Sequence, residues 1–240
     1  MLNRDSFIQK YLFQSSGLFT TPLSTSCRGR LTKSHTTSIK NYFSIFGISF
    51  QNQLINFVKI FNRNAPLILE IGFGTGENLV NMALNHPEKN FLGIEVYLPG
   101  IASCLNQVYL LNIKNLKIIC YNAVDVINNM ISNSQLYQIK IFFPDPWPKK
   151  KHQKRRMLQP DFLFLLSQKL IKNGILHIAT DWNNYAYDII NYIKNIDIYV
   201  DQSFNQAYAD IKKSRIITKF EKKGQILGHK IFDLLFQKKN

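Results

Sequence analysis

The sequence predicts an α/β fold in which helices cover both faces of a doubly wound, mostly parallel β-sheet. Short apolar runs alternate with amphipathic segments from residue 67 onward, as strands and helices do in such folds. A glycine-rich turn follows the first run, and acidic or amide side chains recur where later runs end. Because ligands bind outside the carboxyl ends of parallel strands, we expect one site at that edge of the sheet.

The elements are assigned in chain order by their hydrophobic period. Residues 1–40 are polar without a clear period and are predicted to form a flexible basic N-terminal arm, while 41–240 form a single domain. Its first helix is expected in the later part of 40–62. Continuous apolar runs indicate strands buried on both faces, at 67–71, 91–95, 116–121, 139–143, 174–180 and 229–236. Longer amphipathic segments predict helices at 77–85, 101–111, 124–131, 162–170 and 185–193.

The turn after the first strand favours a nucleoside ligand that carries an amine. Gly72, Gly74 and Gly76 follow Glu70 in a G-x-G-x-G spacing, whereas dinucleotide sites prefer G-x-G-x-x-G. A carboxylate before the glycines suits a cationic amine better than a pyrophosphate. Glu95 ends the next strand, where an acidic residue can bind ribose hydroxyls. S-adenosyl-L-methionine (AdoMet) is therefore favoured over NAD, although a glycine turn alone would also fit an ordinary strand-to-helix connection.

A proline-rich turn, 143–148, follows the fourth strand and presents one carboxylate, Asp145, and one indole, Trp147. The prolines restrict the backbone and are expected to hold Phe143, Asp145 and Trp147 extended. A carboxylate and an aromatic ring can hold a nucleobase, and the basic run 149–156 can hold phosphates. The alternatives are a surface turn with a solvated charge run, and a Trp147 that only braces the turn.

Charge and composition favour a polyanionic partner. The 240 residues carry 30 Lys+Arg and 15 Asp+Glu, a net charge of +15, concentrated at 149–156, 212–223 and the C-terminal tail. Three cysteines without C-x-x-C spacing indicate reduced thiols, and the five histidines share no ligand spacing, so no metal is expected. No apolar run is long enough for a bilayer. We expect a cytoplasmic protein, with His177 a core residue.

These motifs together resemble the bacterial tRNA (guanine-N7-)-methyltransferases over most of the chain. The resemblance implies a class I AdoMet-dependent methyltransferase with a Rossmann-like, mostly parallel seven-stranded sheet. It also implies a tRNA substrate, methylated at guanine 46 of the variable loop, and a monomer or homodimer. The motifs that carry it are Gly29-Arg30-Leu31-Thr32, 70–77, 143–150, Lys154-Arg155-Arg156, Ala179-Thr180-Asp181 and Thr218-Lys219-Phe220-Glu221.

The resemblance also implies roles for individual residues, with Asp145 as the catalytic residue. The family usually has Asp where this chain has Asn122, and often Arg where it has Lys151, which keeps the charge but loses bidentate phosphate geometry. The expected cofactor residues are Glu70, Gly72, Gly74, Gly76, Glu95, Asn122 and Asp145. The expected guanosine contacts are Lys149, Asp181, Thr218, Lys219, Phe220 and Glu221. The expected RNA contacts are Lys151, His152, Gln153, Lys154, Arg155 and Arg156.

The chemistry agrees with this reading, because guanine N7 carries a lone pair and no proton. No base is needed, so Asp145 is expected to accept hydrogen bonds and to stabilise charge on the methylated base. Two alternatives remain. An adenine amino-methyltransferase acting on DNA or RNA would use an [Asp/Asn]-Pro-Pro-aromatic turn, and the turn at Asp145 lacks the second proline. A non-catalytic RNA-binding protein could also retain the fold.

Overall fold

The computed structural model describes residues 29–205 and 215–239, which divide into two compact units. The first unit takes its described residues from 29–65 and 72–130, and the second from 66–71, 131–205 and 215–239. Most of the predicted N-terminal arm, residues 1–28, lies outside the described residues. None of the helices in the described ranges is long and apolar enough to cross a membrane.

The first unit contains parallel strands in the order β1-β4-β3. The apolar residues of β3 and β4 are almost completely buried, as the continuous runs predict. The described strands of this unit are β1 (Gly47–Ile48), β3 (Asn90–Glu95) and β4 (Leu116–Cys120). The described helices are α2 (Lys33–Phe46), α3 (Phe57–Phe61), α4 (Glu77–Asn85), α5 (Leu98–Leu110) and α6 (Ala123–Met130).

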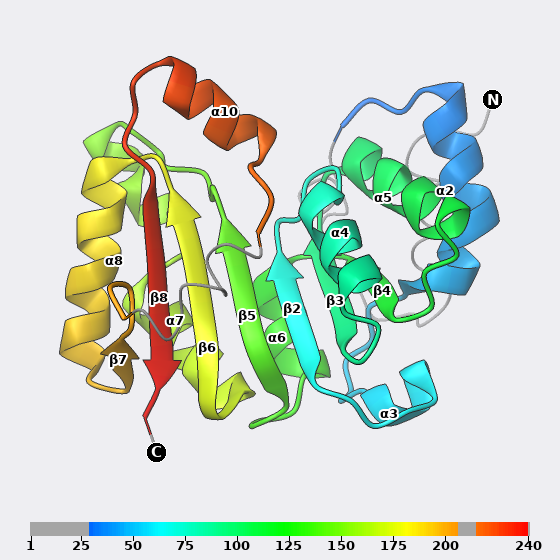
Figure 1. Ribbon diagram of the computed structural model, residues 1–240, viewed down its shortest axis with the longest axis horizontal. Helices are drawn as coiled ribbons and strands as arrows, with labels where there is room; N and C mark the ends of the chain where they lie inside the picture. Colours follow the sequence, from blue (N-terminus) through cyan, green and yellow to red (C-terminus); the bar gives the residue numbers. More distant parts are fainter. Residues whose placement is uncertain (1–28, 206–214, 240) are drawn as a thin grey trace. The chain divides into compact units, whose positions relative to one another are not determined.

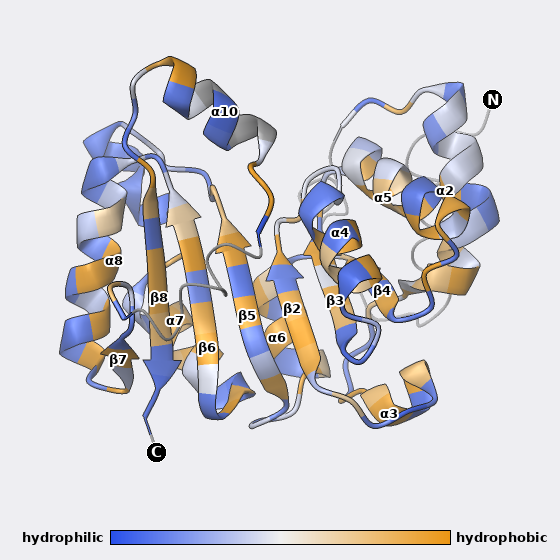
Figure 2. Cartoon of the chain, in the orientation of Figure 1, coloured by the Kyte–Doolittle hydropathy of each residue, from blue (hydrophilic) through white to orange (hydrophobic). Residues whose placement is uncertain are grey.

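The second unit has strands in the order β2-β5-β6-β8-β7, of which β2, β5 and β6 are parallel and β8 runs antiparallel to its neighbours (Figure 1). Figure 2 shows these strands mainly hydrophobic, with hydrophilic bands across them. The described strands are β2 (Leu67–Ile71), β5 (Leu136–Phe142), β6 (Leu170–Thr180), β7 (Tyr199–Asp201) and β8 (Phe232–Lys238). The described helices are η2 (Lys150–Arg155, 3-10), α7 (Pro160–Lys169), α8 (Asn183–Ile196) and α10 (Lys219–Ile226).

The predicted alternation of helices and mostly parallel strands is confirmed, with eight strands in the described residues instead of the implied seven. The two short strands β1 and β7 carry no readable period. Helix α2 was also missed: Thr32 caps it, and its buried Ile39, Phe43 and Phe46 lie at i, i+4 and i+7 in an otherwise polar segment. The last strand begins at Phe232 and not at residue 229, because His229 and Lys230 are exposed.

Candidate active site

In the first unit, the glycine turn is tied to the end of β3. The Gly72 N–H donates to the Ile94 carbonyl at 2.8 Å, and the Gly74 N–H donates to Glu95 Oε2 at 2.8 Å. Gly72 and Gly74 have φ values of +74° and +57°, and a Cβ at either position would meet nothing within 4 Å. The backbone therefore borders open space, where a ligand can approach closely.

At Gly76, the third predicted cofactor glycine, packing between two helices excludes a side chain. A Cβ there would overlap Sγ of Cys104 on α5. Its lack of a side chain lets the start of α4 approach α5 closely.

Three backbone N–H groups fix the Glu95 carboxylate in place. They come from Gly74, from Val96 at 2.6 Å and from Tyr97 at 3.0 Å. A carboxylate offers about four lone-pair sites, so one remains for an outside donor. This geometry fits the predicted binding of a ribose hydroxyl by Glu95.

Asn122 follows β4 at the same edge of the first unit. Glu95 and Cys120 are paired in the parallel register of β3 and β4, and Asn122 lies two residues beyond Cys120. Its Oδ1 accepts the Val124 N–H at 2.8 Å at the start of α6, while the side chain is exposed. An aspartate could accept in the same way, but only the amide also donates. Asn122 can therefore present N–H groups to a ring nitrogen of a nucleoside.

The remaining predicted cofactor residues, Glu70 and Asp145, belong to the second unit. There the carboxyl ends of β2, β5 and β6 lie at one edge of the sheet. Glu70 is 4% exposed near the end of β2, whereas Asp145 is exposed just after β5, and Asp181 follows β6. The structure thus brings Glu70, Asp145 and Asp181 to one edge, as the strand-end argument predicts.

The proline-rich turn corrects one prediction. Phe143 and Trp147 have φ values of +51° and +43°, in the left-handed region and not extended. This conformation is rare for bulky residues, and it is held from outside the turn. The Phe143 N–H continues the β5–β6 pairing by donating to the Ala179 carbonyl at 2.7 Å. Asp145 has no hydrogen-bond or ion-pair partner among the described residues, so its carboxylate is available to a ligand.

Arg156 anchors this turn, a role that differs from the predicted RNA contact. Its side chain is 1% exposed, with Nε donating to the Pro146 carbonyl at 2.8 Å and Nη1 to Asp188 on α8 at 2.5 Å. The guanidinium also lies 4.7 Å from the ring centroid of Tyr185. Burial, opposed by a hydrogen bond from the Leu158 N–H, raises the pKa of Tyr185 to about 12. A side chain enclosed in this way cannot reach a phosphate.

The other predicted RNA contacts lie on or beside η2. Trp147 packs edge-on against His152 with ring centroids 5.9 Å apart, and the Arg155 guanidinium carbon lies 5.1 Å from the Trp147 ring. These contacts support the interpretation of Trp147 as a brace. His152 and Gln153 are half-buried. The exposed basic side chains of this segment are Lys149, Lys150, Lys151, Lys154 and Arg155.

The predicted guanosine contacts Asp181 and Thr218 lie close to α10. A Cβ on Gly224 of α10 would lie 3.1 Å from Asp181 Oδ2, and His229 Nδ1 lies 3.3 Å from the same oxygen. The Thr218 hydroxyl accepts the Glu221 N–H at 3.1 Å, as an N-cap does. Between them, Lys219 and Phe220 form the first turn of α10.

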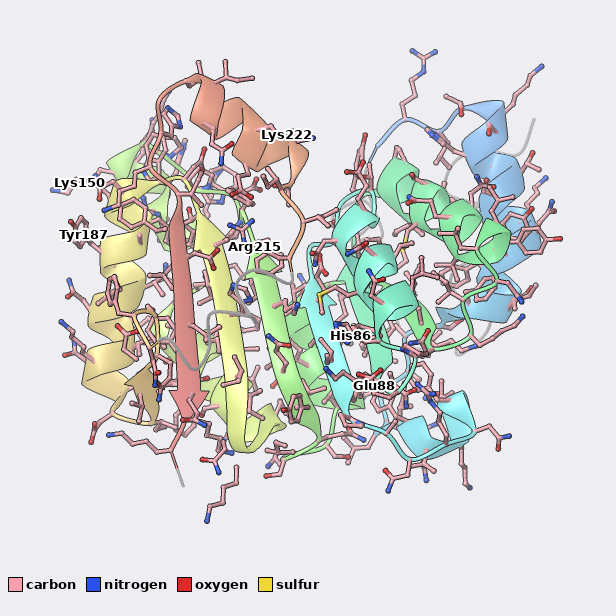
Figure 3. The ribbon with its side chains drawn as sticks, viewed as in Figure 1. His86, Glu88, Lys150, Tyr187, Arg215 and Lys222 are labelled. Atoms are coloured by element: carbon pink, nitrogen blue, oxygen red, sulfur yellow. The ribbon has the colours of Figure 1, made fainter. Side chains whose placement is uncertain are left out.

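The Glu221 carboxylate is held by Arg215, which the sequence analysis did not single out. Arg215 donates from Nη1 and Nη2 to the two Glu221 oxygens, and from Nε to Asp233 Oδ2 at 2.9 Å. Its guanidinium carbon also lies 5.7 Å from the centroid of the Phe142 ring at the end of β5. Arg215 lies beneath α10 in Figure 3. It therefore connects α10, β8 and the strand that leads to Asp145.

His177 completes this buried cluster, and its predicted core position is confirmed. It is 0% exposed, and Nε2 lies 2.6 Å from Asp233 Oδ1, while Nδ1 has no partner among the described residues. Burial lowers the pKa of His177, although Asp233 opposes this. A neutral ring with its proton on Nε2 fits this geometry. Although burial acts in the opposite direction, the hydrogen bond from His177 holds the pKa of Asp233 below its usual value.

A sequence signal for part of this cluster existed. Thr218 and Glu221 match the capping-box spacing, which marks the start of a helix. Asp233, by contrast, lies far from Arg215 in the sequence, and no local pattern pairs them.

Within the described residues, no group of three or more His, Cys, Asp or Glu side chains could hold a metal ion.

Comparisons with known proteins identify the family. A family model described as "Putative methyltransferase" matches residues 64–234. The chain is 54% identical over 214 residues to a tRNA (guanine-N(7)-)-methyltransferase of Buchnera aphidicola subsp. Acyrthosiphon pisum (strain 5A), covering 89% of this chain and 90% of the relative. It is 43% identical over 211 residues to the protein of the same name from Pectobacterium atrosepticum, covering 88% of each.

Solved structures agree in fold. The aminoglycoside resistance methyltransferase NpmB1 aligns with a TM-score of 0.52 at 11% identity, covering 81% of this chain and 98% of that one. The 16S rRNA methyltransferase KamB aligns with a TM-score of 0.51 at 10% identity, covering 77% and 93%. These similarities confirm the predicted Rossmann-like methyltransferase fold.

Proposed function

Because this chain belongs to the tRNA (guanine-N(7)-)-methyltransferase family, we propose that it transfers a methyl group from AdoMet to N7 of a guanine in tRNA. Family membership supports the reaction, and the resemblance of its motifs supports guanine 46 of the variable loop as the target. The exposed Asp145, which keeps its hydrogen-bonding capacity on a tightly anchored turn, is the structural observation that carries the proposal.

The residues of the first unit fit the nucleoside part of AdoMet. The open backbone at Gly72 and Gly74 permits close approach, Glu95 keeps an acceptor site for a ribose hydroxyl, and Asn122 offers donors to the adenine ring. Glu70 is proposed to hold the cationic amine. When bound, AdoMet supplies an activated methyl group on its sulfonium.

The chain's own task is alignment and charge stabilisation. Guanine N7 attacks with its in-plane lone pair, so no side chain has to remove a proton. Asp145 is proposed to accept hydrogen bonds from the guanine or the cofactor amine, and to stabilise the positive charge that develops on the purine. Asp181 is proposed to accept from the N1–H and N2–H groups of the guanine. The exposed Lys149 is proposed to contact the same nucleoside.

The test is methyl transfer from radiolabelled AdoMet to unmodified tRNA, followed by nucleoside digestion and mass spectrometry. Labelled 7-methylguanosine, lost when the variable-loop guanine is replaced, is the expected product. Label in methyladenosine would refute the proposal in favour of an adenine amino-methyltransferase. No label with AdoMet still bound would refute it in favour of a non-catalytic protein.

Asp145→Ala tests the catalytic assignment. We expect loss of methyl transfer with the fold intact and most AdoMet binding retained, because Gly74 and Glu95 remain unchanged. Removing an electrostatic stabiliser of this kind costs about a hundred- to thousandfold in kcat. Asp145→Asn is the matched variant, since it keeps the size but loses the charge. Equal loss of AdoMet binding and of thermal stability would contradict a catalytic role.

A further inference from the structure

Beside Asp181 the second unit contains a pocket of about 440 Å³, and apart from Asp181 none of its lining residues has a role in the proposed reaction. Its walls come from the β6–α8 connection, from α8 and from the segment that enters β8. The lining side chains that matter are Asp181, Trp182, Tyr187, His229, Lys230 and Phe232.

The strand order separates this pocket from the catalytic turn. In the second unit β6 lies between β5 and β8 (Figure 1). Asp145 follows β5, whereas none of the residues that line the pocket comes from β5 or its turn. A guanine held between Asp145 and Asp181 would occupy the β5 side of Asp181, so the pocket lies on the far, β8 side.

The chemistry of the walls suits a nucleotide. The Tyr187 and Phe232 rings lie 6.2 Å apart at an interplanar angle of 59°, and Lys230 Nζ lies 5.2 Å from the Phe232 centroid. Tyr187 is 56% exposed and projects outward from α8 in Figure 3. His229 adds a second basic group, while Asp181 is the one acidic side chain among the lining residues. Aromatic faces stack bases and adjacent cations bind phosphate.

We propose that this pocket binds the nucleotide next to the target guanosine in tRNA, with its base against Tyr187 and its phosphate at Lys230. The inference rests on the proposed function. An enzyme that works on a base must take it out of the stack, which separates it from its neighbours. A site that holds one displaced neighbour would lower the cost of that opening, and it would set the position of the guanine at Asp181.

The test uses the full chain and tRNA in which 2-aminopurine replaces either neighbour of the target guanine. The fluorescence of 2-aminopurine is quenched when the base stacks. Tyr187→Ala should raise the Kd and KM for tRNA about five- to hundredfold, and Tyr187→Phe should stay within about twofold of the wild type. Binding to the wild type should quench one of the two labelled positions, and Tyr187→Ala should abolish that quenching. Lys230→Ala should weaken binding and flatten its salt dependence.

Tyr137→Ala and Lys172→Ala are the matched controls. Both side chains are exposed near the amino-terminal ends of β5 and β6, away from the proposed site, and both variants should behave like the wild type. Unchanged tRNA affinity in Tyr187→Ala would overturn the inference, as would weaker binding without any change in quenching at either neighbour. If the wild type forms no 7-methylguanosine, the proposed function fails instead, and the fluorescence result stays independent of that outcome.

Discussion

Replacing Arg215 by methionine tests whether the buried cluster positions α10, the segment proposed to bind the target guanosine. The Arg215 and Glu221 side chains are 6% and 7% exposed, and Asp233 is 22% exposed. Removing one member of a buried ion pair costs about 3–5 kcal/mol, because the partner charge is left unpaired. Since Asp233 keeps some contact with water, we expect the lower end, about 3 kcal/mol. For a chain of this size that corresponds to a Tm lower by roughly 6–12 °C.

The loss of activity should exceed the loss of stability. Without Arg215, Glu221 and the cap at Thr218 lose their anchor, and a small misplacement of a substrate-binding group can cost about a hundredfold in rate. Steady-state kcat/KM for tRNA and AdoMet affinity are measured well below the variant's Tm. We expect a large fall in kcat/KM with AdoMet binding retained. Lys172→Met, which removes an exposed cation near the amino-terminal end of β6, is the control and should change neither kcat/KM for tRNA nor AdoMet affinity.

A triple variant separates positioning from stability. Arg215→Met, Glu221→Gln and Asp233→Asn together leave no unpaired charge, so much of the lost Tm should return. Activity should not return, because the contact that orients α10 is still absent. An unchanged Tm and kcat/KM in Arg215→Met would refute the reasoning, and so would full recovery of activity in the triple variant.

The remaining predictions concern pH, the turn and α10. The pKa of His177 is lowered in the folded state, so its contribution to stability is complete above the unfolded value of about 6.5 and is lost as pH falls below that value. The free energy of unfolding, measured in urea between pH 8 and 5, should therefore fall with pH, and His177→Gln should make that fall smaller. Arg156→Met should lower Tm without changing the salt slope of tRNA binding, whereas Lys154→Ala should flatten that slope and keep Tm. Gly224→Ala should raise KM for tRNA modestly, because the new methyl group would lie 3.1 Å from Asp181 Oδ2 and force a small shift of that carboxylate, while an unchanged KM would show that Asp181 can move without loss.

The sequence predicted those elements whose signal is local. The run at 67–71 and the amphipathic segment at 77–85 match β2 and α4 at both ends, because continuous burial and a helical period are visible in a short window. The strand-end rule also predicted that the polar site residues lie at the carboxyl ends of the strands, and within each unit they do: Glu95 with Asn122 in the first, and Asp145 with Asp181 in the second. Such positions follow from chain order and parallel pairing alone.

What could not be predicted depends on contacts between distant segments. Arg156 reads as one more cation in a basic run, and only the fold shows that Asp188 and the Pro146 carbonyl enclose it. The positive φ values of Phe143 and Trp147 oppose the local preference of residues before proline, so they too require the surrounding structure. Local rules failed here at the turn that carries the proposed catalytic residue, where strain is commonly found.

The acidic groups of the second unit differ in a way that supports the division of roles. Glu221 and Asp233 are bound by Arg215, and Asp181 faces His229, so each has a fixed position in the protein. Asp145 alone among these four is exposed and lacks such a partner in the described residues. A carboxylate that the described residues leave uncompensated, on a turn that Arg156 holds from behind, can respond to charge that appears only during the reaction. We therefore propose that the cluster around Arg215 supplies rigidity and that Asp145 supplies the free charge that a methylated purine requires.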